Sequence, residues 1–215
     1  MADPSNPHKG QPVLQSGAGL DEATAAVIML HGRGADAADI LGLAGSFDRP
    51  ALAYLAPDAA GHTWYPRPFI APVAQNQPYL ASALELIADI IGLLITRDIP
   101  PERIALVGFS QGACLALEFA ARHPDRYGAV VALTGGLIGD VIDPADYRGS
   151  LEGTPVFIGS SDVDPHIPFA RVGESTAVME KLGAEVTEKI YPGMGHTINE
   201  DEVSHVRALL DRLTG

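Results

Sequence analysis

The chain has 215 residues, of which 47% are hydrophobic, and 27 acidic residues against 14 lysines and arginines give it a net charge of −13. A chain of this length buries roughly 70% of its unfolded surface, which is enough for a sizeable core and excludes disorder for most of it. The acidic balance repels phosphate backbones and anionic lipid heads, so we expect neither nucleic-acid binding nor membrane-surface binding.

The single cysteine, Cys114, excludes an intrachain disulfide framework and a zinc site built from several cysteines. No apolar run of the secretory type occurs in the first twenty residues, and acidic residues interrupt the most apolar window, residues 84–95. We therefore expect a soluble, cytoplasmic protein without a membrane span. Residues 1–12 are expected to form a flexible tail, and residues 13–215 one domain.

Beyond this tail, apolar runs of strand length alternate with helical patterns. Continuous runs predict strands buried on both faces, at residues 25–30, 51–56, 104–107, 129–133 and 155–159. An alternating run at 186–191 predicts an edge strand, and residues 13–15 could begin another. Apolar residues at helical spacing predict helices at 79–96, 111–122, 168–182 and 200–213. This order predicts an α/β fold with a mostly parallel central sheet and helices on both faces.

Two long connections, residues 57–78 and 135–154, interrupt the alternation. Loops of this length in a compact domain are usually functional. The second connection is too short to form a separate lid domain, so we expect a fairly open site.

Residues 108–112 read Gly-Phe-Ser-Gln-Gly and match the G-x-S-x-G pattern between a predicted strand and a predicted helix. A serine on so tight a turn projects its hydroxyl above the sheet, and the flanking glycines allow the strained backbone. The start of the helix offers free N–H groups to a developing oxyanion. We predict that Ser110 is a nucleophile; the alternative is an ordinary glycine-rich turn with a capping serine.

A serine nucleophile needs a base that is held by a third group. Among the seven histidines, His196 lies in a glycine-rich loop between the last strand-like run and the last helix, at the predicted carboxyl edge of the sheet. The acid should lie between Ser110 and His196, after a strand. Asp162 and Asp164 both meet this condition.

Taken together, these motifs resemble the α/β hydrolases of the phospholipase/carboxylesterase family, which includes the acyl-protein thioesterases. The matching stretches are distributed over nearly the whole chain after the tail, at residues 30–34, 64–66, 108–112, 164–168 and 192–197. This resemblance implies an α/β-hydrolase fold, with the triad order Ser, Asp, His.

The resemblance also ranks the two acids. In this family the acid is typically followed by an aliphatic residue three positions on and a proline four positions on. Ile167 and Pro168 provide this pattern for Asp164, which we favour. Asp162 stays as the rival, because it follows Gly159 at a spacing that some members use.

Two backbone N–H groups usually form the oxyanion hole in this family, which implies Gln111 and Arg33 here. Many relatives have an aliphatic residue where Arg33 stands. Its side chain therefore either adds a positive group at the pocket mouth or is simply solvated. Trp64 and Tyr65 are implied to line an acyl pocket; the alternative is a loop anchored by its own aromatic residues.

We predict a serine carboxylesterase that cleaves small-molecule esters through an acyl-enzyme, with Ser110, His196 and Asp164 as its triad and no cofactor. An acyl-thioesterase or lysophospholipase with the same residues is the first alternative. A lactone hydrolase is less favoured, because a close relative would carry cysteine as the nucleophile, and a non-catalytic ligand-binding protein would not need a triad. The acidic and histidine residues at 162–166 are a weak metal signal, and we predict no metal site. A homodimer would be unsurprising for proteins similar to this one.

Overall fold

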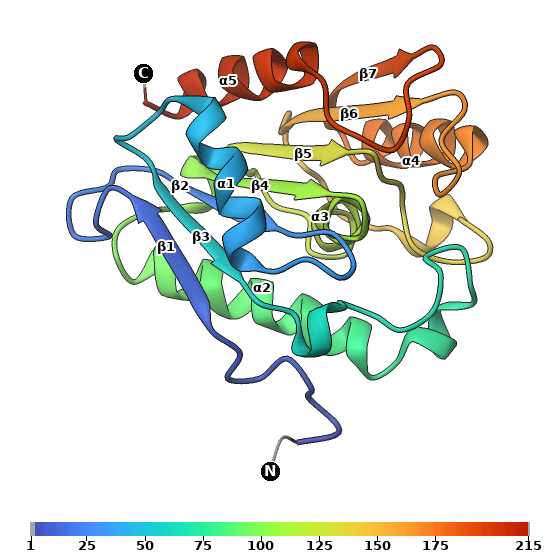
Figure 1. Ribbon diagram of the computed structural model, residues 1–215, viewed down its shortest axis with the longest axis horizontal. Coiled ribbons are helices and arrows are strands. Elements are labelled where there is room, and N and C mark those ends of the chain that lie inside the picture. Colours follow the sequence, from blue (N-terminus) through green and yellow to red (C-terminus); the bar gives the residue numbers. More distant parts are fainter. Residues whose placement is uncertain (1–2, 215) are drawn as a thin grey trace.

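The computed structural model describes residues 3–214 and arranges their seven strands in one sheet. The strands are β1 (Val13–Gly17), β2 (Ala26–Leu30), β3 (Ala53–Pro57), β4 (Ile104–Phe109), β5 (Ala129–Leu133), β6 (Pro155–Ser161) and β7 (Glu185–Tyr191). Their order across the sheet is β1-β3-β2-β4-β5-β6-β7 (Figure 1). β1 pairs with β3 in the antiparallel sense and the other pairs are parallel, so the predicted mostly parallel sheet is confirmed.

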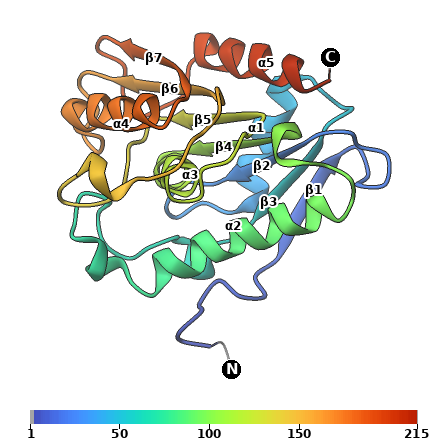
Figure 2. The same cartoon turned by 180° about the vertical axis from the view of Figure 1, so that it is seen from behind.

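Helices cover both faces of the sheet, as predicted. They are α1 (Ala37–Phe47), α2 (Tyr79–Ile95), α3 (Gln111–Arg122), α4 (Phe169–Lys181) and α5 (Glu200–Thr214). Helices α1 and α5 lie on one face, while α2, α3 and α4 lie on the other (Figures 1 and 2). Within residues 3–214, no helix has both the length and the apolar character needed to cross a membrane.

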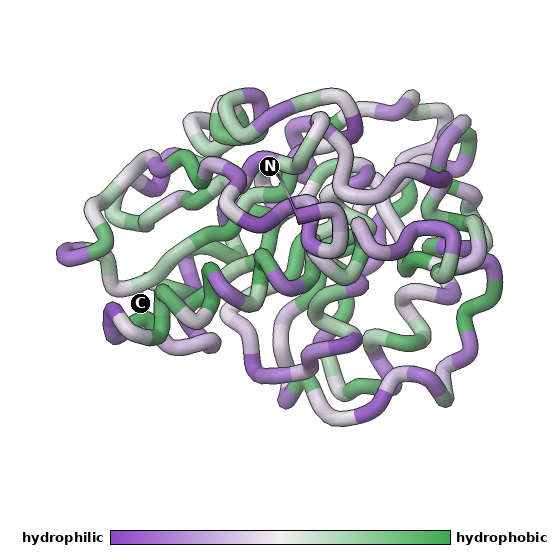
Figure 3. The backbone as a smooth tube through the Cα atoms, turned by 90° about the horizontal axis from the view of Figure 1, so that it is seen from below, coloured by the Kyte–Doolittle hydropathy of each residue, from purple (hydrophilic) through white to green (hydrophobic). Residues whose placement is uncertain are grey.

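The sheet separates two apolar layers. One packs against α2, α3 and α4, and the other packs against α1 and α5. Strands β2, β3 and β5 are buried along their whole length, which explains their continuous apolar sequences. Hydrophobic stretches accordingly cross the middle of the molecule, and hydrophilic stretches gather on the outer turns (Figure 3).

Helix α1 is absent from the elements predicted from the sequence. The Asp36 side chain caps it by accepting the Asp39 N–H, and the Asp39 carboxylate in turn accepts the Asp36 backbone N–H. Four of its residues, spaced three or four apart, are buried against the sheet: Ala37, Ile40, Ala44 and Phe47. The sequence predicts this helix only weakly, because two of the four buried residues are alanines and two glycines interrupt the helix.

The segment before β1 differs from the predicted flexible tail at His8, which is fully buried. Its backbone N–H donates to Ser82 Oγ at 2.8 Å, its Nε2 lies 3.0 Å from the Trp64 carbonyl oxygen, and its Nδ1 accepts the Ala60 N–H at 3.0 Å. Burial lowers the pKa of His8. These polar partners satisfy a neutral imidazole in the interior and so anchor the segment to the domain.

Candidate active site

Ser110 occupies the turn between β4 and α3, with a φ of +54°. A non-glycine residue in this region is strained by about 1–3 kcal/mol, and such residues concentrate at functional sites. A Cβ atom at Gly108 would overlap the carbonyl oxygen of Gly112, and a Cβ atom at Gly112 would overlap the carbonyl oxygen of Leu30. Both glycines are therefore needed for the close packing of strand, turn and helix that presents Ser110 at the carboxyl edge of the sheet.

Three predicted residues meet at this edge, in loops that follow β4, β6 and β7. His196 Nε2 lies 2.8 Å from Ser110 Oγ, and His196 Nδ1 lies 2.8 Å from Asp164 Oδ2. A carboxylate only accepts hydrogen bonds, so Nδ1 carries the proton and Nε2 is free to accept the serine proton. The structure thus brings Ser110, His196 and Asp164 into one hydrogen-bonded chain.

The carboxylate of Asp164 is covered from solvent. Its Oδ1 accepts the backbone N–H of His166 at 2.7 Å and of Ile167 at 3.0 Å. Burial opposes ionisation, but the N–H groups of His166, His196 and Ile167 outweigh it and lower the pKa of Asp164 below its ordinary value. Asp164 is therefore held as an anion beside the imidazole.

The rival acid, Asp162, has a different partner. Its Oδ1 accepts the backbone N–H of Gly193 at 2.8 Å, and its side chain is exposed. This bond joins the loop after β6 to the loop that carries His196. The structure places Asp164, and not Asp162, against the imidazole.

A cavity of about 620 Å³ opens beside Ser110 and His196. Arg33 and Gln111, the two residues expected to supply oxyanion donors, lie on its wall. The remaining wall is largely apolar and includes Tyr65, Pro66, Pro68, Phe69, Phe109 and Ile167. A polar nucleophile beside an apolar wall suits a substrate that has a reactive polar group attached to an apolar chain.

Only one of the two aromatic residues expected in the pocket lines it. Both side chains are buried, but Tyr65 lies on the cavity wall and Trp64 does not. The indole Nε1 of Trp64 donates to the His31 carbonyl oxygen at 2.8 Å, and its ring lies 4.8 Å from the His31 ring. The prediction for Trp64 is corrected, because its side chain turns into the core and supports the loop after β2.

Sequence reasoning treated His166 only as part of a weak metal signal. In the structure its ring lines the cavity, and it meets the His196 ring edge-on at a centroid distance of 4.8 Å. Over residues 3–214, no three or more His, Cys, Asp or Glu side chains converge as metal ligands would. Its position two residues after Asp164 was the feature of the sequence that could have placed His166 at the site.

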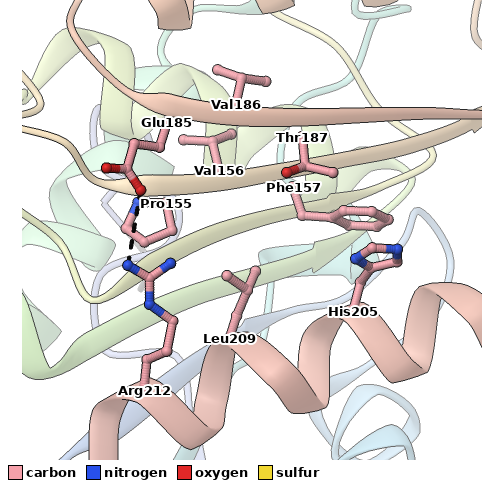
Figure 4. Close-up of a pocket in the computed structure, with 9 residues that line it drawn as sticks. All are labelled: Pro155, Val156, Phe157, Glu185, Val186, Thr187, His205, Leu209 and Arg212. Atoms are coloured by element: carbon pink, nitrogen blue, oxygen red, sulfur yellow. Dashed lines mark ion pairs between the residues drawn. The ribbon is translucent and has the colours of Figure 1, made fainter.

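A second hollow, of about 190 Å³, lies between α5 and the amino ends of β6 and β7 (Figure 4). The ring of Phe157 stacks on His205 there at 4.7 Å, and Arg212 lies 3.8 Å from Glu185. Because Ser110 follows the carboxyl end of β4, this hollow lies at the opposite edge of the sheet and does not belong to the site.

The sequence model that describes phospholipases and carboxylesterases matches residues 12–214. The chain belongs to the phospholipase/carboxylesterase family. A phospholipase/carboxylesterase structure from Dyadobacter fermentans is 43% identical, with a TM-score of 0.90 over 94% of this chain and 96% of that one. The Bacillus cereus carboxylesterase, 19% identical, shares the fold with a TM-score of 0.74 over 95% of each chain. The fold is therefore the α/β-hydrolase fold of this family.

Curated relatives of the present chain include proteins named acyl-protein thioesterase 1. The one from Gibberella zeae is 34% identical over 121 residues, which are 54% of this chain and 50% of the relative. The one from Saccharomyces cerevisiae is 32% identical over 121 residues, which are 55% of this chain and 53% of the relative. The chain spans about half the length of the curated relatives it matches.

Proposed function

We propose that the protein is a serine hydrolase that cleaves carboxylic esters through an acyl-enzyme. The observation that carries this proposal is the hydrogen-bonded chain from Ser110 through His196 to Asp164 at the wall of an apolar cavity. Membership of the phospholipase/carboxylesterase family supports it.

In the acylation step, Ser110 Oγ attacks the carbonyl carbon of the ester while His196 Nε2 takes the hydroxyl proton. Asp164 stabilises the imidazolium that forms, and its lowered pKa keeps it charged for this role. The backbone N–H groups of Arg33 and Gln111 bind the oxyanion. When the tetrahedral intermediate collapses, the C–O bond to the leaving group breaks and His196 returns the proton to the departing alcohol.

Deacylation repeats the sequence with water. His196 removes a proton from water, the hydroxide oxygen attacks the acyl carbon, and Ser110 leaves with the proton that His196 held. The carboxylic acid is released and the enzyme is restored. Protein groups and water carry out each step.

A thioester is the second candidate substrate, because the curated relatives named above are acyl-protein thioesterases. The same nucleophile, base and oxyanion donors serve both reactions, since only the leaving atom changes from oxygen to sulfur. A lysophospholipase would likewise use this site. Leaving-group preference therefore separates these activities.

The test combines labelling with substrate profiling. A fluorophosphonate should modify the wild-type protein at Ser110 and should not modify Ser110→Ala. Initial rates are then measured on p-nitrophenyl esters from acetate to palmitate, beside a long-chain acyl thioester. Absence of labelling together with absence of hydrolysis would overturn the proposal in favour of a ligand-binding protein, and a preference for the thioester would assign the second candidate.

A further inference from the structure

The side chain of Arg33 contacts three successive carbonyl groups. Its Nη2 donates to the carbonyl oxygens of Tyr65 at 2.9 Å and Arg67 at 3.0 Å, and its Nη1 donates to that of Pro66 at 3.2 Å. The side chain is therefore more than a solvated cation, because its donors hold a backbone segment. We call this segment, Tyr65–Arg67, the wall segment.

Gln111 also holds this part of the chain. Its Nε2 donates to the Tyr65 carbonyl oxygen at 2.8 Å, and its Oε1 accepts the Trp64 N–H at 2.9 Å. The two residues with proposed oxyanion donors therefore both attach their side chains to the wall segment or its immediate neighbour. The positions of the oxyanion donors and of the pocket wall are consequently linked.

The wall segment contributes Tyr65 and Pro66 to the lining of the cavity. Phe69, another residue of the lining, is held independently of Arg33. The Phe69 carbonyl oxygen accepts the Gly139 N–H at 2.8 Å, and the Phe69 ring lies 5.7 Å from the Arg171 guanidinium carbon. Loss of the Arg33 side chain would therefore remove its donors to Pro66 and Arg67 and loosen the wall segment there, while Gln111 still holds Tyr65 and Phe69 stays anchored.

We propose that Arg33 is a positioning residue that fixes the wall segment and thereby determines which acyl chains the pocket accepts. The proposal rests on the proposed esterase function. A pre-formed wall contacts the acyl chain without a further cost of ordering the loop. Each methylene that gains such contact is worth about fourfold in affinity, so the benefit increases with chain length. Acetate reaches little of the wall, whereas octanoate extends along it.

The test compares two arginines that a hydrogen bond joins, from the Arg33 side chain to the Arg67 carbonyl oxygen. Arg33→Met keeps an unbranched stem and removes the donors, while Arg67→Met removes an exposed charge and keeps the backbone carbonyl that Arg33 holds. Values of kcat and KM are measured with p-nitrophenyl acetate and p-nitrophenyl octanoate. We expect the octanoate-to-acetate ratio of kcat/KM to fall about tenfold in Arg33→Met, mainly through a higher KM for octanoate, corresponding to lost contact with about two methylenes. The ratio should not change in Arg67→Met.

Arg33→Lys is the conservative variant. An ammonium group cannot reproduce a planar fork, so we expect the ratio to recover only in part. A wild-type ratio in Arg33→Lys, with Arg67→Met lowering the ratio as much as Arg33→Met, would overturn the proposal in favour of a simple charge effect. Equal losses for acetate and octanoate in Arg33→Met would also overturn it, because Arg33 would then act on the chemistry alone.

Thermal unfolding and fluorophosphonate labelling identify which variants are folded. If Arg33→Met does not fold, the ratio in Arg33→Lys decides, and an unchanged ratio there rejects the proposal. Wild-type labelling at Ser110 and hydrolysis of acetate test the proposed function separately from this ratio, so the two proposals can fail independently.

Discussion

Glu202 gives a quantitative prediction for how stability depends on pH. This residue of the first turn of α5 is fully buried. Its Oε2 accepts the Asn199 N–H at 2.9 Å, while its Oε1 has no hydrogen-bond partner within residues 3–214 and faces Gly159, where a Cβ atom would overlap it. Burial raises the pKa of Glu202 to about 7; the Asn199 N–H lowers it in part, and Asp201 raises it further.

The sign follows from a folded-state pKa above the ordinary value of 4.5. Below pH 4.5 the carboxyl group is neutral in both states, and its stabilising contribution is fully present. Between pH 4.5 and about 7 the unfolded chain loses the proton while the folded protein keeps it, so the free energy of unfolding decreases as pH rises. The interval from 4.5 to about 7, at about 1.4 kcal/mol per pH unit, gives a loss of about 3 kcal/mol. For a chain of this length the loss corresponds to about 10 °C in Tm.

The variant that tests this effect is Glu202→Gln, which keeps an acceptor for Asn199 and removes the ionisation. Urea unfolding from about pH 4.5 to 8 should show the wild type losing about 3 kcal/mol relative to this variant. All other titrating groups occur in both proteins, so the difference isolates Glu202. Glu200→Gln is the matched control, because its side chain is 77% exposed in the same helical turn, and its curve should run parallel to the wild type. If the curve of Glu202→Gln also ran parallel to the wild type, Glu202 would not be the group that is held protonated by burial.

Four further predictions concern the proposed chemistry. Ser110→Ala should keep the wild-type Tm but lose about 10⁵–10⁶ in kcat; near-normal turnover of p-nitrophenyl acetate would exclude the serine mechanism. Asp164→Asn should lose about 10³–10⁴ in kcat with little change in Tm, because an amide cannot stabilise the imidazolium. Asp162→Asn should lose far less, since its amide oxygen still accepts the Gly193 N–H; comparable losses for both variants would contradict the assignment of the acid. In a pH profile, kcat/KM should fall on acidification from about pH 7 to 5, as imidazoles protonate. Asp164 stays ionised over that range because its pKa is lowered. A flat profile would show that another step controls turnover.

Much of the fold could be predicted because the sheet is buried on both faces. Strands β2, β3 and β5 are continuous apolar runs, which are typical neither of a solvated loop nor of an amphipathic helix. Helix α1 was missed because its buried stripe contains small residues, and its clearest signal is the capping pair Asp36 and Asp39. Burial of His8 was also hidden, since its partners come from segments more than fifty residues away.

In the site, too, some residues can be identified from the sequence around them, while others depend on contacts between distant segments. Ser110 lies in a motif whose two glycines are required by close packing, Gly108 against Gly112 and Gly112 against Leu30, so the sequence around the serine is informative. Asp162 and Asp164 follow the same strand, and only the three-dimensional path of the loop determines that Asp164 meets His196. Trp64 and Tyr65 are adjacent and both are buried, yet Tyr65 contributes to the cavity lining and Trp64 does not. No local pattern records that difference.

Arg33 and Gln111 show why side-chain and backbone roles at this site can be tested separately. Their proposed catalytic atoms are backbone N–H groups, which every residue except proline possesses. Their side chains, in contrast, hold the backbone at Trp64–Arg67. A substitution by a side chain without donors, such as Arg33→Met, removes the contact with the wall and keeps the oxyanion donor. A loss of kcat that is the same for acetate and octanoate would then come from movement of that donor, and it measures how strongly the pocket wall and the oxyanion hole are coupled.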